Sequence, residues 1–191
     1  MSEGAAPTRD GLVWVFGYGS LMWKPGFSVE AFEPATLQGY HRSLCIRSQH
    51  WRGTAERTGL VLGLAPTRHC KGRGIGITKA REAEVLAYLD ERELVTAVYE
   101  RLRLPLVLLD GSEVEAWAYV AKPDHDQFAG DLPLDEVVAT VKGAEGIGGR
   151  NDDYVRNTVL HLREMGIHEP RLEAVLAALE GPPFGTDGGG I

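Results

Sequence analysis

The first hydrophobic stretch of the chain predicts a strand that is buried on both faces. Residues 13–16 read Val-Trp-Val-Phe, and an unbroken run of β-branched and aromatic residues is typical of a fully covered strand. The run ends in a loop at residues 17–21, which read Gly-Tyr-Gly-Ser-Leu. Two glycines around Tyr18 permit backbone angles closed to other residues and let a ligand approach the main-chain N–H groups. The loop is therefore a candidate carboxylate cradle, or else an ordinary tight turn with Tyr18 packed in the core.

Strands dominate the first part of the chain, and helices dominate the last third. Strand-forming runs occur at Thr36–Arg47, Gly59–Ala65, Arg73–Thr78, Tyr99–Leu109 and Glu113–Ala121, with a hairpin signal at Asp110-Gly111 between the last two. Helical patterns cover Ala80–Glu93, Asp135–Lys142, Asp152–Met165 and Pro170–Glu180, with Asn151 as an N-cap and Gly166 as a C-terminal stop. This order predicts an α+β fold. Glycines inside the strand runs favour a strongly curved, mostly antiparallel sheet that closes into a small barrel.

The size and charge of the chain favour one domain that binds a small polar substrate. The chain has 191 residues, enough for one sizeable core, so we expect a single domain over residues 11–181. Residues 1–10 and 182–191 are small, polar or rich in Gly and Pro, and we expect them to be flexible. The net charge of −7 argues against nucleic-acid or membrane partners, which need basic patches. With neither a leader pattern nor a long apolar run, we expect a cytoplasmic protein.

No pattern in the sequence indicates a metal or a disulfide. Cys45 and Cys70 lie far apart and form no Cys-x-x-Cys unit, and the six histidines show no ligand spacing. We therefore expect two free thiols and no metal ion.

The helix predicted over residues 80–93 places one carboxylate on its apolar face. Each helical residue advances about 100° around the axis, so with Leu86 at zero Leu89 falls at about 300° and Glu93 at about 340°. Glu84 and Glu91 fall at about 160° and 140°, on the solvated face. Burial raises the pKa of a carboxyl group and makes it a better base near neutral pH. Glu93 is therefore a candidate general base.

Two other interpretations of Glu93 remain open from the sequence. It is the last residue of the predicted helix, where it can fray into solvent. It can also pair with an arginine of the following strand, Arg101 or Arg103. Either arrangement would leave Glu93 without a catalytic role.

Several motifs, in this order and spacing, resemble the ChaC-like γ-glutamylcyclotransferases. They are FGYGSLMW at residues 16–23, GYHRS at 39–43, WRGT at 51–54, AYLDERELVTAVY at 87–99 and NDDYVRN at 151–157. Enzymes of this family cleave glutathione to 5-oxoproline and cysteinylglycine. The resemblance covers about residues 13–167 and implies a small barrel with helices around it.

The family motifs also imply roles for particular residues. The Glu that follows Arg92 and precedes Tyr99 matches the family's catalytic base and is Glu93. The substrate-binding residues implied by the loop motif and by the two tyrosines are Gly17, Tyr18, Gly19, Ser20, Leu21, Met22, Tyr99 and Tyr154. The resemblance implies no cofactor. An arginine, Arg42, Arg47 or Arg52, is expected to attract the anionic substrate, and the sequence does not say which.

One departure from the family pattern and three other functions stay open. The family usually has glycine before the conserved Tyr, whereas this chain has Ala97-Val98, which adds bulk beside the expected pocket. The alternatives are a cyclotransferase for other γ-glutamyl peptides or amines, a non-catalytic regulator of ion transport, and a thiol-dependent hydrolase. The hydrolase lacks a matching His and Asp arrangement.

Overall fold

The structure is a computed structural model that describes residues 9–181. The described chain forms two compact units: the first runs to Ile46 and continues over Leu62–Gly130, and the second contains Arg47–Val61 and the residues from Asp131 onward. The ends that we expect to be flexible fall mostly at residues 1–8 and 182–191, which lie outside the described residues. Arg9 is an exception, because it lies in the 3-10 helix η1 (Arg9–Gly11) and forms ion pairs with Glu33 and Asp110.

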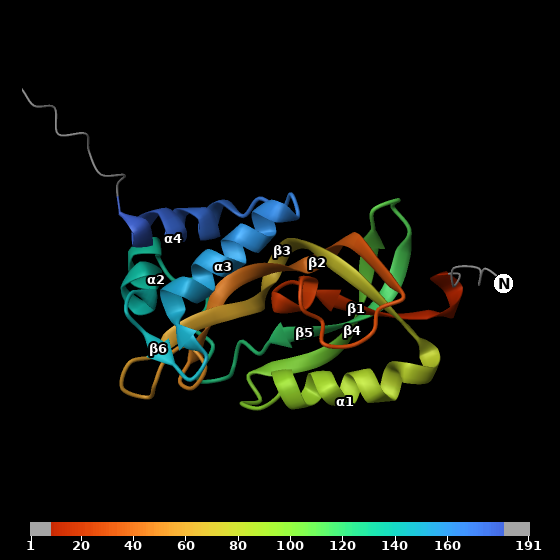
Figure 1. The fold of residues 1–191 in the computed structure, drawn as a ribbon, viewed down its shortest axis with the longest axis horizontal. Helices are drawn as coiled ribbons and strands as arrows, with labels where there is room; N and C mark the ends of the chain where they lie inside the picture. Colours follow the sequence, from red (N-terminus) through yellow and green to blue (C-terminus); the bar gives the residue numbers. More distant parts are fainter. Residues whose placement is uncertain (1–8, 182–191) are drawn as a thin grey trace, which may run out of the picture. The chain divides into compact units, whose positions relative to one another are not determined.

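Five strands close into a barrel. They are β1 (Leu12–Gly17), β2 (Ala31–Ser48), β3 (Gly59–Thr78), β4 (Tyr99–Leu108) and β5 (Glu113–Ala121), in the order β1-β3-β2-β4-β5 (Figure 1). Strand β1 runs antiparallel to β3, with Trp14 opposite Gly76, and closes the barrel by a parallel pairing with β5. The expected α+β fold with a mostly antiparallel barrel is confirmed, and so is the burial of Trp14 and Phe16 in the first strand.

Strand β3 corrects the prediction of two separate strands at Gly59–Ala65 and Arg73–Thr78. The chain between them, which includes the exposed segment Pro66–His69, continues the same strand. Its polar, exposed residues break the apolar pattern that marks a strand in the sequence. Thr67 and Arg68 have left-handed φ angles of 86° and 62°, so the strand is locally distorted there rather than interrupted.

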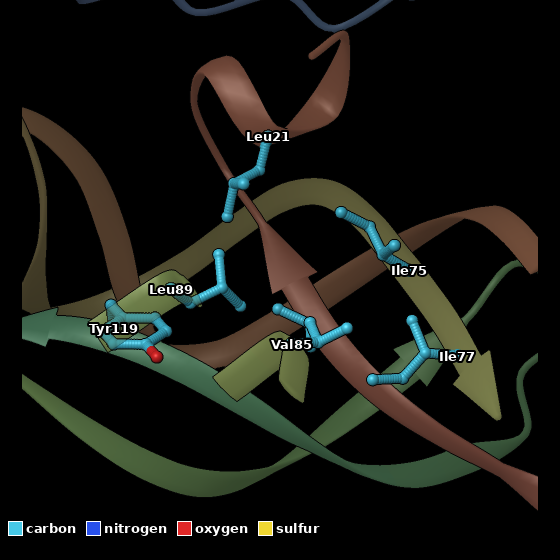
Figure 2. Close-up of a cluster of buried hydrophobic side chains, with 7 residues drawn as sticks. Leu21, Ile75, Ile77, Val85, Leu89 and Tyr119 are labelled. Atoms are coloured by element: carbon cyan, nitrogen blue, oxygen red, sulfur yellow. The ribbon is translucent and has the colours of Figure 1, made fainter. Parts of the chain in front are cut away.

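Helix α1 (Glu82–Glu93) packs its apolar stripe against one face of the barrel. The helix follows the short 3-10 helix η3 (Lys79–Arg81) and ends at Glu93, as predicted. Figure 2 shows Leu21, from the loop after β1, gathered with Val85 and Leu89 of the helix. The whole buried cluster consists of Val15, Leu21, Ile75, Ile77, Val85, Leu89 and Tyr119. The loop and the helix therefore share one core.

The second unit carries the remaining helices, as the sequence predicts. They are α2 (Leu134–Val141), α3 (Asn151–Glu164) and α4 (Pro170–Glu180), with a small hairpin of β6 (Glu145–Gly146) and β7 (Gly149–Arg150) before α3. Gly166 adopts a φ of +68° after α3, which confirms the predicted stop. None of the helices in residues 9–181 has the length and apolar character that crossing a membrane requires.

The N-cap assignment of Asn151 was wrong. Asn151 is the first residue of α3 and makes no side-chain cap. Its buried amide instead accepts a hydrogen bond from the N–H of Leu60 at 2.7 Å and donates one to the carbonyl of Leu60 at 2.8 Å. The side chain therefore fastens α3 to the start of β3.

Candidate active site

The loop after β1 winds into a single 3-10 turn, η2 (Ser20–Met22). The N–H of Met22 donates to the carbonyl of Gly19 at 2.9 Å, and the N–H of Trp23 donates to that of Ser20 at 3.2 Å. Leu21 and Met22 are buried. This packing holds the turn in place and leaves Ser20 half-buried at its start.

Neither glycine of the loop has a left-handed φ, yet the ψ of −134° at Gly19 lies outside the regions usual for residues with a side chain, in agreement with the sequence argument. Gly17 and Gly19 are absent from the described residues with positive φ, and φ of Gly19 is −133°. Packing around Gly17 is tight, since an added Cβ would lie 3.2 Å from Cδ1 of Ile75 and that side chain would have to shift slightly. At Gly19 an added Cβ would lie 3.7 Å from Cδ1 of Leu62, an ordinary contact. What Gly19 provides is a main chain that a ligand can approach closely.

The side chain of Tyr18 packs in the core, as the tight-turn interpretation expects. It is 8% exposed, and its ring stacks on Phe16 with centroids 6.5 Å apart. Its carbonyl accepts a 2.6 Å hydrogen bond from Nε of buried Arg42, which also donates to the carbonyl of Lys71 at 2.7 Å. Arg42 therefore ties the loop to β3.

Glu93 lies at the end of the apolar stripe of α1, and its side chain is 21% exposed. Burial raises its pKa above the ordinary value, and the Arg92 guanidinium, 3.3 Å from Oε1, opposes part of that rise. In the described part of the chain, neither Arg101 nor Arg103 forms an ion pair with Glu93. Arg101 donates to Asp90 at 2.6 Å, and Arg103 lies over the ring of Trp117. Glu84 and Glu91 are exposed, as the helical periodicity predicts.

Arg92 connects the helix to the loop, and the sequence did not reveal this contact. Its Nη2 donates to Oγ of Ser20 while its Nε faces Glu93. One guanidinium thus joins the hydroxyl of the candidate cradle to the candidate base. The only sequence signal was the Arg-Glu pair itself.

A polar network fixes α1 on the barrel just before Glu93. Tyr119 of β5 donates to Oδ1 of Asp90 at 2.7 Å, and Arg101 of β4 donates to Oδ2. Desolvation and the Asp90 hydrogen bond raise the pKa of Tyr119. At the other end of the helix, Nε1 of Trp117 donates to Oε1 of Glu82 at 2.9 Å. The last turn of α1 therefore has a fixed position.

Tyr99 and Gly19 both lie beside Leu62. The hydroxyl of Tyr99 donates to the Leu62 carbonyl at 2.7 Å, and Cδ1 of Leu62 lies beside the Gly19 main chain. Just before Tyr99, Val98 is buried, whereas Ala97 is exposed and has a left-handed φ of 56°. The bulk that Val98 adds is directed into the core.

The profile of the ChaC-like protein family matches residues 13–181. This chain belongs to that family. A glutathione-specific γ-glutamylcyclotransferase of Escherichia coli is 30% identical over 171 residues, which cover 90% of this chain and 74% of that protein. A protein of the same description from Schizosaccharomyces pombe is 29% identical and covers 86% of this chain and 92% of that one.

A solved structure supports the same fold for this ChaC-like protein. The crystal structure of a yeast γ-glutamyl cyclotransferase specific to glutathione superposes with a TM-score of 0.78 at 22% identity, over 89% of this chain and 96% of that one. The barrel and its helices are therefore shared between the two proteins.

The predicted site residues of this ChaC-like protein fall into two groups. The first unit brings together the loop, Tyr99 and Glu93. Tyr154 lies on α3 of the second unit, where the guanidinium of Arg52 sits 5.1 Å from its ring centroid and donates to the carbonyl of Gly148. In the part of the chain that the structure describes, no three His, Cys, Asp or Glu side chains gather as a metal site requires.

Proposed function

We propose that this ChaC-like protein cleaves the γ-glutamyl bond of glutathione and releases 5-oxoproline and cysteinylglycine. The observation that carries the proposal is the desolvated carboxylate of Glu93, joined through Arg92 to the hydroxyl of Ser20. The activity named for the relatives and the shared fold support it.

The reaction is an intramolecular acyl transfer. The α-amine of the γ-glutamyl group loses a proton to Glu93 and attacks its own γ-carbonyl carbon, so that a C–N bond closes a five-membered ring. The bond to the cysteinyl nitrogen then breaks, and Glu93 returns the proton to that leaving nitrogen. Because nucleophile and electrophile belong to one molecule, the protein has to hold the folded-back conformer and move protons. This chemistry requires no cofactor.

The loop after β1 is the proposed site for the α-carboxylate of the substrate. Among the described residues, the main-chain N–H groups of Gly19, Ser20 and Leu21 donate to no main-chain acceptor. Amide donors and a hydroxyl that converge on one anion make strong, charge-assisted hydrogen bonds. The N–H of Met22 is already used by Gly19, so Met22 contributes packing. Tyr99 and Tyr154 as pocket borders stay predictions.

The test is an assay of the purified chain with glutathione in the presence of EDTA. We expect stoichiometric release of 5-oxoproline and cysteinylglycine, with EDTA causing no loss. Faster turnover of γ-glutamylalanine would shift the assignment to other γ-glutamyl compounds. Binding without product would favour a regulatory module, and a strict metal requirement would contradict the cofactor-free mechanism.

The cellular setting is a separate part of the proposal. We expect the protein to act in the cytoplasm on a small-molecule substrate, without nucleic-acid or membrane partners. Fractionation of cells that express the tagged chain tests this location.

A further inference from the structure

Among residues 9–181, Arg92 is the one side chain for which contacts to both the loop and Glu93 are observed. Its Nη2 donates to Oγ of Ser20, and its Nε lies 3.3 Å from Oε1 of Glu93. The arginine is 30% exposed and the glutamate 21%. Both contacts therefore lie where water is partly excluded.

The contact between Arg92 and Glu93 is not an ordinary helical ion pair. Successive helical residues point about 100° apart, so neighbours in sequence do not face each other. A cation in the last turn usually reaches toward the free carbonyls of the helix end or into solvent. Here the side chain turns back to Ser20, and this conformation brings its Nε beside the carboxylate.

The surrounding charges leave Arg92 as the cation that acts on Glu93. On the neighbouring turn and strand, Asp90 and Arg101 pair with each other, and the hydroxyl of Tyr119 donates a hydrogen bond to Asp90. Arg103 lies over Trp117. Within residues 9–181, the ion pair with Arg92 is the only polar contact found for the Glu93 carboxylate. Its Oε2 is thereby left for a substrate proton.

We propose that Arg92 is a positioning residue that fixes the Ser20 hydroxyl and the Glu93 carboxylate relative to each other. The planar guanidinium presents several donors in a fixed fork, which one lysine nitrogen cannot reproduce. The inference rests on the proposed function: it assigns to one residue the coupling between the α-carboxylate site and the base. It also gives Arg92 a second effect, because its charge counteracts the rise in pKa that burial causes at Glu93.

The first test follows the titration of Glu93 without substrate. In the full chain labelled with 13C at glutamate carboxyl carbons, NMR should show a higher pKa for Glu93 in Arg92→Met than in wild type. Arg92→Lys, which retains the positive charge, should bring the pKa of Glu93 most of the way back to its wild-type value. Arg81→Met is the matched control. Arg81 directly precedes the same helix and pairs with the exposed Glu84 of its first turn, so its replacement should leave the Glu93 titration unchanged.

The second test uses turnover of glutathione to separate binding from proton transfer. In Arg92→Met the acidic limb of kcat should move to higher pH, and KM should rise several-fold. In Arg92→Lys the acidic limb should return to its wild-type pH while KM stays raised, because one ammonium group cannot hold both Ser20 and Glu93. Ser20→Ala should raise KM in wild type but add little in the Arg92→Met background, as expected for groups that act together.

The two proposals fail in different ways. A wild-type chain that releases no 5-oxoproline overturns the proposed function. An Arg92→Met variant that folds and keeps the wild-type Glu93 titration overturns the present inference, whatever the activity assay gives. Strictly additive effects of Ser20→Ala and Arg92→Met on KM would also overturn it.

Discussion

The two ends of α1 each carry an arginine–glutamate pair, yet the two glutamates have opposite pKa shifts. At the start, Arg81 lies 3.0 Å from Glu84, which is 70% exposed, and the arginine lowers the pKa of that carboxyl. At the end, Arg92 lies 3.3 Å from Glu93, which is 21% exposed, and desolvation raises its pKa despite the nearby cation. The degree of solvation of the carboxyl group, and not the presence of an arginine partner, therefore decides the direction of its pKa shift.

This difference separates a surface ion pair from a site. Exposed pairs such as Arg81–Glu84 contribute little to stability, since water screens them. A carboxylate at the end of an apolar stripe loses hydration when the protein folds, and its charged form is therefore destabilised. Ionisable groups with pKa values shifted in this way gather at functional sites. The predictions below test the contrast between the two ends.

The largest effect should come from Glu93→Gln. The amide keeps the shape of the side chain but cannot accept the ammonium proton, so kcat for glutathione should fall by about 10²–10⁴ with KM nearly unchanged. Glu84→Gln and Glu91→Gln, on the solvated face, are the matched controls and should keep turnover. Steady-state kinetics of all three folded variants settles the point; near-normal kcat in Glu93→Gln would place the base elsewhere.

Gly19→Val should weaken binding of the substrate at the loop. An added Cβ at Gly19 meets only an ordinary contact, although the ψ of −134° there is unusual for a residue with a side chain. The barrel should therefore stay folded while the valine shifts the loop or blocks the approach to its N–H groups. Loss of a hydrogen bond to a charged group costs about 1.5–3 kcal/mol, or roughly 10–150-fold in KM. Gly11→Val, where a Cβ also has open space, is the control. Equal KM values for the two variants would refute the cradle.

The desolvated charge of Glu93 should also lower the stability of the protein near neutral pH. Its pKa is raised in the folded state, so its favourable contribution is present below the unfolded pKa of about 4.3 and is lost as pH rises through the folded pKa. Glu93→Gln should therefore be more stable than wild type at pH 7.5, with the gap closing near pH 4. Urea unfolding at both pH values measures it. A gap that widens toward acid would contradict the direction of the shift.

The smallest effect is expected just after the helix, at Ala97. Its left-handed φ of 56° strains a residue with a Cβ, by about 1–2 kcal/mol. Replacement by glycine relieves this strain, but the greater conformational entropy of glycine in the unfolded chain offsets part of the gain in stability. Ala97→Gly should therefore stabilise the chain by about 1 kcal/mol or less, measured as a rise in Tm. Ala83→Gly, at an exposed position inside α1, should instead lower the Tm. A loss of stability in Ala97→Gly would contradict the strain.

The sequence predicted most of the fold because its patterns are local. The burial of β1, the end of α1 at Glu93 and the start of α4 at Pro170 follow from periodicity and cap residues. The face of the helix on which Glu93 lies follows from the same periodicity. These features depend on neighbours within a few residues, which the sequence contains directly.

The errors arose where distant contacts override local signals. Asn151 looks like an N-cap, but its amide is used by Leu60, 91 positions away. Gly17 looks like a turn glycine, although the closest constraint on it is distant in sequence, because an added Cβ would crowd the side chain of Ile75. Arg92 lies 72 positions from Ser20, so no local pattern indicates their contact.

The pH dependence of kcat/KM for glutathione, compared between wild type and Glu93→Gln, tests the central claim most directly. We expect wild-type activity to rise with pH along an acidic limb that lies above the ordinary carboxyl range of about 4.3, because burial raises the pKa of Glu93. The limb should be absent from the residual activity of the variant. An acidic limb that persists unchanged in Glu93→Gln would contradict the assignment of Glu93 as the base.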